Sequence, residues 1–115
     1  MYLVLKTTTD KIVQMGSVFE AVRGHWLLDP QHAEQCSHVI AVADKTVKEV
    51  FTLDKIYKST LWGGRYVFAG ETDTALTNKL RGREISSELC LKWAENPVRY
   101  VEEDELFSTN TLAEV

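Results

Sequence analysis

The stretch VIAVADKTVKEVFTL, residues 39–53, decides the fold. Residues 39–43 form an unbroken run of β-branched and small apolar side chains, which is typical of a strand covered on both faces. The polar residues 44–46 separate this run from the β-prone segment 47–53, so we expect a hairpin that joins two antiparallel strands. Residues 39–43 are therefore the predicted central strand of a sheet.

The flanking sequence adds short strands and short helices to this hairpin. β-prone segments predict further strands at residues 2–5, 55–58, 65–69 and 98–101. Capping patterns predict helices at residues 18–23, 30–36, 72–80 and 86–94, with N-caps at Ser17, Asp29, Asp73 and Ser86. We expect an α+β domain with a curled antiparallel or mixed sheet, or a small open β-barrel, and short flanking helices. A parallel βαβ arrangement is disfavoured because tight turns join the central strands.

Charge is unevenly distributed along the 115 residues. The chain has 13 Lys and Arg against 17 Asp and Glu, a formal net charge of -4. Five of the acidic residues follow residue 101, where no basic residue occurs, so the rest of the chain has 13 basic and 12 acidic groups and a charge of +1. We predict one domain over residues 1–101 and a frayed acidic tail over residues 102–115.

Sequence features also bear on location. No apolar stretch approaches the roughly 20 residues of a membrane-spanning helix, and residues 1–9 lack the basic and long apolar regions of a secretion signal. We therefore expect no membrane partner and a cytoplasmic protein. In that reducing compartment Cys36 and Cys90 are expected to be buried thiols rather than a disulfide.

Motifs for catalysis are absent from the sequence. His25, His32, Cys36 and His38 lie near one another, but they lack the paired close ligands that are typical of zinc sites. No serine or cysteine has a nucleophile signature, and no glycine-rich phosphate loop is present. We predict a protein that is not an enzyme, with no catalytic residue, metal or cofactor.

Aromatic and basic residues are interleaved, a mixture that can stack bases and contact phosphates. The predicted nucleic-acid-binding residues are Arg23, Trp26, Tyr57, Trp62, Arg65 and Tyr66. The alternative for Arg23 is a structural link between helix and sheet, and Trp26, Phe68 and Trp93 also suit core packing. Trp62 is the best candidate for an exposed aromatic because Gly63 and Gly64 place it in a loop.

Four elements, in order, resemble a small uncharacterised bacterial and phage domain family of the PUA-like type. They are an Arg-Gly-x-Trp element at 23–26, a strand pair at 38–51, an Arg-aromatic-x-Phe-x-Gly strand at 65–70 and an Asn-Pro-x-Arg-Tyr element at 96–100. The resemblance implies a small β-barrel that binds RNA or DNA, including modified bases. Two departures are Asp44-Lys45 in place of a hairpin glycine, and Tyr57 and Tyr66 where Trp is common.

A different class of function is also compatible with the sequence. The chain could be a small phage-type interaction or counter-defence protein that binds a host protein, with the acidic segment 102–115 involved. The two hypotheses differ in the expected effect of that segment. Removing residues 102–115 should leave nucleic-acid binding unchanged or strengthen it, whereas it should abolish binding to a protein partner.

Overall fold

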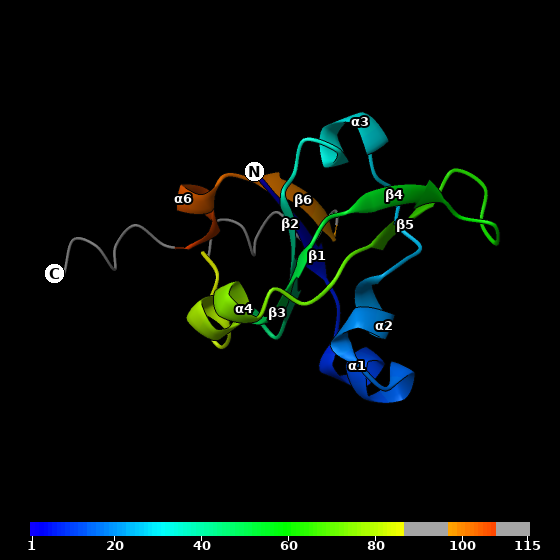
Figure 1. Ribbon diagram of the computed structural model, residues 1–115. Helices are drawn as coiled ribbons and strands as arrows, with labels where there is room; N and C mark the ends of the chain where they lie inside the picture. Colours follow the sequence, from blue (N-terminus) through cyan, green and yellow to red (C-terminus); the bar gives the residue numbers. More distant parts are fainter. Residues whose placement is uncertain (87–96, 108–115) are drawn as a thin grey trace, which may run out of the picture.

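A computed structural model describes residues 1–86 and 97–107 and shows an α+β fold (Figure 1). The described strands form a four-stranded sheet in the order β3-β2-β1-β6 and a two-stranded sheet of β4 and β5; they form no closed barrel. The strands are β1 (Tyr2–Lys6), β2 (His38–Ala43), β3 (Thr46–Thr52), β4 (Lys55–Lys58), β5 (Tyr66–Ala69) and β6 (Val98–Val101). The helices are α1 (Thr9–Met15), α2 (Val18–Val22), α3 (Pro30–Ala33), α4 (Thr74–Leu80) and α6 (Glu103–Leu106).

The four-stranded sheet is mixed. β1 pairs antiparallel with β6 but parallel with β2, in a register that runs from Tyr2 opposite His38 to Lys6 opposite Val42. The expectation that parallel pairing is disfavoured was therefore wrong for this pair. Residues 7–37, with helices α1 to α3, are long enough for the crossover that two parallel strands need.

The predicted hairpin is confirmed, with β2 and β3 antiparallel around a turn at Asp44 and Lys45. Its register contains a bulge, because Ala41 lies opposite Glu49 while the next residue, Val42, lies opposite Val47. Lys48 is the extra residue. An extra residue shifts the alternation of side chains by one position, and this shift puts both Val47 and Val50 in one core.

Both faces of the sheet are buried, as the unbroken apolar run in β2 predicts. On one face, Ile40 and Val42 pack with residues of α4 and α6, including Leu80 and Leu106. On the other face, Val39 and Ala41 pack with residues of α2, α3 and the β4–β5 sheet. Figure 1 shows α4 and α6 on one side of the sheet and α1 and α2 on the other. The domain thus has two cores that share one sheet.

The segment 71–85 covers the outer edge of β3. Backbone N–H groups of Thr52 and Val47 donate to the carbonyls of Glu71 and Arg83, at 2.8 and 3.0 Å, and Asp73 N–H donates to Val50 at 2.9 Å. These bonds occupy an edge that would otherwise be open to another chain.

Several helices differ from the expectation. α1 was not predicted, α3 is shorter than the expected 30–36, and α4 begins after its predicted cap, Asp73, whose side chain accepts from Leu76 N–H. Most of the predicted helix 86–94, with Trp93 and Cys90, lies outside the described residues. None of the helices in the described ranges is long and apolar enough to cross a membrane.

Residues 102–107 correct the expectation of a tail that is frayed from residue 102. Glu102 caps α6, whose last residue, Leu106, is fully buried in the core that contains Val4 and Ile40. The Arg83 guanidinium lies 3.8 Å from the centre of the Phe107 ring. The acidic side chains suggest a solvated tail, but the two apolar residues after them, Leu106 and Phe107, pack in and against the core and anchor the segment. Residues 108–115 lie outside the described ranges.

Candidate nucleic-acid interface

The β4–β5 hairpin carries positive charge and exposed aromatic side chains. Between residues 55 and 69 the chain has three basic residues and no acidic one. Ile56 and Phe68 point into the core, whereas Tyr57 and Trp62 are 44% and 58% exposed. Figure 1 shows the loop between β4 and β5 at one end of the molecule, away from the four-stranded sheet. This hairpin is the part of the described surface where bases could stack beside cations.

Ser59 organises the loop that carries Trp62. Its Oγ accepts hydrogen bonds from the backbone N–H groups of Leu61 and Trp62 at 3.1 and 3.0 Å, and it lies 2.7 Å from Nδ1 of His25. Backbone N–H of Ser59 donates to Arg65 across the loop at 2.8 Å. The exposed indole therefore sits on a hydrogen-bonded turn.

Residues 23–26 run beside β5 and join the hairpin to α2. Trp26 exchanges two backbone hydrogen bonds of 2.9 Å with Tyr66, and Phe68 N–H donates to the carbonyl of Arg23 at 2.9 Å. Gly24 is required here, because a Cβ at this position would lie 2.0 Å from Cγ1 of Val67. This close approach brings α2 and the hairpin to the same side of the molecule.

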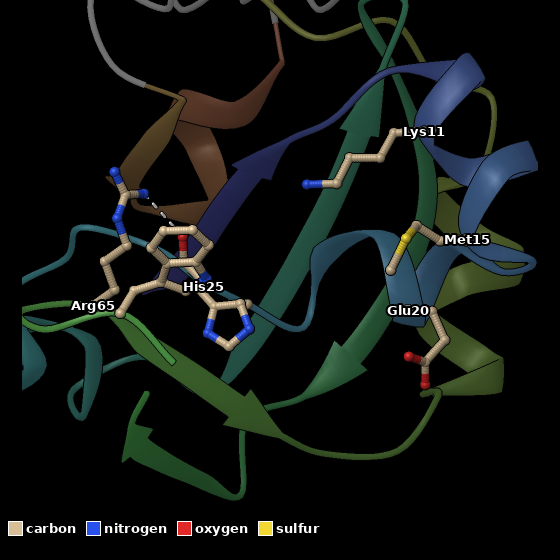
Figure 2. A pocket seen from close by; sticks show the side chains of 7 residues that line it. Lys11, Met15, Glu20, His25 and Arg65 are labelled. Atoms are coloured by element: carbon tan, nitrogen blue, oxygen red, sulfur yellow. Dashed lines mark hydrogen bonds between the residues drawn. The ribbon is translucent and has the colours of Figure 1, made fainter. Parts of the chain in front are cut away.

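A hollow of about 380 Å³ lies between this hairpin and the first two helices (Figure 2). Its lining residues come from α1, α2, the segment beside β5 and the hairpin loop: Lys11, Met15, Glu20, Gly24, His25, Trp62 and Arg65. In Figure 2 the side chain of Lys11 extends from α1 toward His25. Met15 and Glu20 lie on the side of the hollow opposite His25. The space is comparable to the small-molecule pockets of other proteins.

The lining combines two cations, one carboxylate, an imidazole and apolar surface. The Nη1 of Arg65 donates to the carbonyl of His25 at 3.2 Å, which fixes one end of the guanidinium and leaves its other N–H groups for a ligand. Nζ of Lys11 lies 5.8 Å from the centre of the Trp26 ring. Such a lining can hold a flat, anionic ligand with hydrogen-bonding edges.

Of the six residues predicted from the sequence, Trp62 and Arg65 line the hollow. Arg23 is exposed and its Nε lies 3.5 Å from the carboxylate of Glu20. Tyr57 is exposed elsewhere on the hairpin, and Tyr66 is half-buried.

Trp26 does not join the predicted group. It is only 8% exposed, and its indole N–H donates to the carbonyl of Val22 at 2.7 Å. Both the ring and its single donor are used inside the core. Trp26 is therefore a packing residue, the alternative that its large apolar area allowed.

The sequence interpretation missed Lys11, Met15, Glu20 and His25. Lys11 and Met15 belong to α1, which has no buried residue and hence no apolar stripe to reveal it. Its signals are at its ends: the Thr8 side chain accepts from Lys11 N–H, and Gly16 ends the helix with φ of 93°.

The residues considered for a metal site have other partners. His32 stacks on Tyr100 at 3.9 Å between ring centres, and His38 Nε2 lies 3.0 Å from Asp73. Cys36 is buried, and this burial raises the pKa of its thiol. Within residues 1–86 and 97–107, no three His, Cys, Asp or Glu side chains gather as metal ligands would.

The groups with shifted pKa values lie outside the hollow. Burial raises the pKa of the Tyr2 and Tyr100 hydroxyls. The Leu76 backbone N–H and then His38 lower the pKa of Asp73, which caps α4. These shifts have structural causes and do not mark a catalytic group.

A second hollow, of about 440 Å³, lies between α1 and β3. It is lined by Ile12, Val18, Val47 and the basic residues Lys48 and Arg81, among others. Arg81 Nε donates to the carbonyl of Lys48 at 3.1 Å, so this arginine supports the bulge in β3. The first hollow is the stronger candidate because it has an exposed aromatic ring beside its cations.

In comparisons with protein-family models, curated proteins and solved structures, nothing matches this chain.

Proposed function

We propose that this protein is a non-enzymatic nucleic-acid-binding module of PUA-like type that works in the cytoplasm. A single strand of RNA or DNA follows the β4–β5 hairpin, and one unpaired base, modified or not, enters the hollow between the hairpin and α1. The observation that carries the proposal is the exposed Trp62 on the lining of a hollow that also contains Lys11 and Arg65. The resemblance at residues 23–26 and 65–70 favours the same class of ligand.

In this proposal the basic residues contact phosphates and Trp62 stacks on a base. Lys55, Lys58 and Arg65 neutralise phosphates without sequence preference, and Lys11 adds one cation at the hollow. Trp62 stacks on a base, which is worth about 1–3 kcal/mol per base in single-strand binding proteins. With three or four phosphate contacts, the affinity is expected to fall with salt at a logarithmic slope of about -2 to -3.

Fluorescence anisotropy with labelled single-stranded RNA, single-stranded DNA and duplex DNA tests the proposal. We expect single strands to bind best at low salt, and Trp62→Ala to weaken binding about tenfold through lost stacking. Leu61→Ala is the matched control, since Leu61 is 73% exposed in the same loop but has no ring. Absence of binding at low salt, or equal loss in both variants, would contradict the proposal.

Binding to a host protein is the second candidate function. Exposed apolar side chains support it, because Val13, Leu27 and Leu61 are 76%, 60% and 73% exposed. Deleting residues 102–115 would not discriminate the two functions, since Leu106 belongs to the core.

The double variant Glu103→Gln/Asp104→Asn is the better test, because both side chains are exposed on α6. A protein partner held by the acidic segment would be lost from pulldowns with this variant. Nucleic-acid binding would be unchanged or stronger, because two negative charges are removed.

A further inference from the structure

We propose that the hollow selects guanine, an inference that rests on the proposed function and names the base that the site accepts. It follows from the one carboxylate, Glu20, and the one imidazole, His25, that line a hollow whose other charged groups are cations. The phosphate-contacting cations are indifferent to the base. We therefore assign base selectivity to Glu20 and His25, the two polar lining side chains outside this set of phosphate-contacting cations.

Glu20 lies in the first turn of α2 and lines the hollow. Its backbone N–H donates to Oγ of Ser17, the N-cap of the helix, at 3.1 Å. Its Oε2 lies 3.5 Å from Nε of Arg23, one turn along the chain. A carboxylate accepts hydrogen bonds at both oxygens and donates none when ionised. Glu20 therefore offers a pair of acceptors to a ligand edge.

The hydrogen-bond pattern around Ser59 assigns the proton of His25. Two backbone N–H groups, of Leu61 and Trp62, donate to Oγ of Ser59 and use its two lone pairs. The remaining hydroxyl proton can then only donate, and the atom in reach is Nδ1 of His25 at 2.7 Å. In the neutral ring the proton must be on Nε2. His25 is thus a hydrogen-bond donor toward a ligand in the hollow.

Among the four unmodified bases, only guanine presents two adjacent N–H donors to a carboxylate on one side of the hollow and a neighbouring acceptor to a donor on the other. Its N1–H and N2–H are adjacent donors, and O6 beside them is an acceptor. Adenine and cytosine place an acceptor nitrogen next to their amino group, and uracil flanks its one imino group with two carbonyls. A carboxylate facing any of these three bases would meet a lone pair. Guanine can pair with Glu20 through two N–H groups and accept from His25 Nε2–H at O6.

The test compares oligonucleotides that are identical except for one base. A labelled uridine-rich RNA pentamer carries guanosine, inosine, adenosine or cytidine at its centre, and affinity is measured by anisotropy with the full chain. Inosine lacks only the N2 amino group, so it removes one of the two donors. We expect guanosine to bind about tenfold better than adenosine or cytidine, with inosine between them.

The variant Glu20→Gln sharpens the result. An amide has a single oxygen, so the difference between guanosine and inosine should vanish while binding to the uridine background persists. Glu34→Gln, which changes an exposed carboxylate directly after α3, is the charge-matched control and should keep the preference.

The outcomes separate the inference from the proposed function. Equal binding of all four central bases, or better binding of inosine than guanosine, overturns guanine selection and leaves nucleic-acid binding intact. A guanosine preference that Glu20→Gln leaves unchanged also overturns it. No binding of any strand overturns both. The comparison of guanosine with inosine uses the natural sequence, so it stands even if a variant fails to fold.

Discussion

The four-stranded sheet and the β4–β5 hairpin are made of similar strands but have opposite surroundings. In β1 and β2 every residue from Leu3 to Leu5 and from Val39 to Ala43 is fully buried. In β4, by contrast, only Ile56 is partly covered, and the other three residues are exposed. The sheet has apolar neighbours on both faces and contributes stability, whereas the hairpin keeps its lysines and the rings of Tyr57 and Trp62 in solvent. The difference indicates that the sheet supplies stability, and the proposed binding uses a separate part of the chain.

The largest effect is expected where the two parts join, at Gly70. A Cβ there would lie 1.7 Å from the backbone oxygen of Thr52, which a side-chain shift cannot relieve. We expect Gly70→Ala to lower the free energy of unfolding by about 3 kcal/mol or more, measured by urea denaturation. Gly63→Ala in the hairpin loop is the control, because nothing lies within 4 Å of its Cβ position. A similar stability for both variants would contradict the close contact.

One truncation in the four-stranded sheet and one in the β4–β5 hairpin compare how much each contributes to the free energy of unfolding. Leu3→Ala removes a fully buried side chain from the sheet and should cost about 3 kcal/mol of unfolding free energy. Leu61→Ala removes an exposed side chain of the same size from the hairpin and should cost less than about 0.5 kcal/mol. Thermal denaturation of both variants checks the difference. Equal losses would mean that the hairpin is also a source of stability.

A substitution in the turn between β2 and β3 is expected to have a smaller effect of opposite sign, an increase in the free energy of unfolding. Asp44 and Lys45 have φ values of 52° and 65°, which are the conformations of a type I′ turn and disfavour a side chain. Lys45→Gly should raise the free energy of unfolding by about 0.5–1 kcal/mol. Lys45→Ala tests the cause: since alanine keeps a Cβ at positive φ, it should give no gain, and a gain would point to the lost charge instead.

Acid should weaken the sheet through Asp73, which caps α4 and contacts His38 at the start of β2. The pKa of Asp73 is lowered, chiefly by Leu76 N–H, so its contribution is complete above its unfolded value of 3.8 and is lost as pH falls through the folded value. Stability measured from pH 5 to 2 should decline, and Asp73→Asn should flatten that decline. An unchanged slope in the variant would exclude this carboxylate as a cause.

Local patterns were sufficient for most of the strands. The run at residues 39–43 and the interruption at 44–46 predict β2, β3 and their turn, because burial on both faces leaves an unbroken apolar signature. Pairing between distant segments has no such signature. The parallel contact of β1 with β2 depends on three helices in between, one of which, α1, has no apolar stripe.

The candidate site was predicted only in part for the same reason. Trp62 and Arg65 were found because glycines mark their loop and because both residue types suit a nucleic-acid site. Trp26 was indistinguishable from them by type, and only its burial separates it. Glu20 and Lys11 reach the hollow through the packing of α1, α2 and the hairpin, which no local pattern records.

The bulge at Lys48 has a consequence for chain length. Val42 pairs with Val47 and Ala41 with Glu49, so the residue between them has no partner of its own on β2. A deletion of Lys48 would leave a regular ladder in which Val47 and Val50 still face the same core. Relatives of this chain that are one residue shorter at this point would keep the same inward-facing side chains. An alignment gap is therefore expected at Lys48 rather than in the turn beside it.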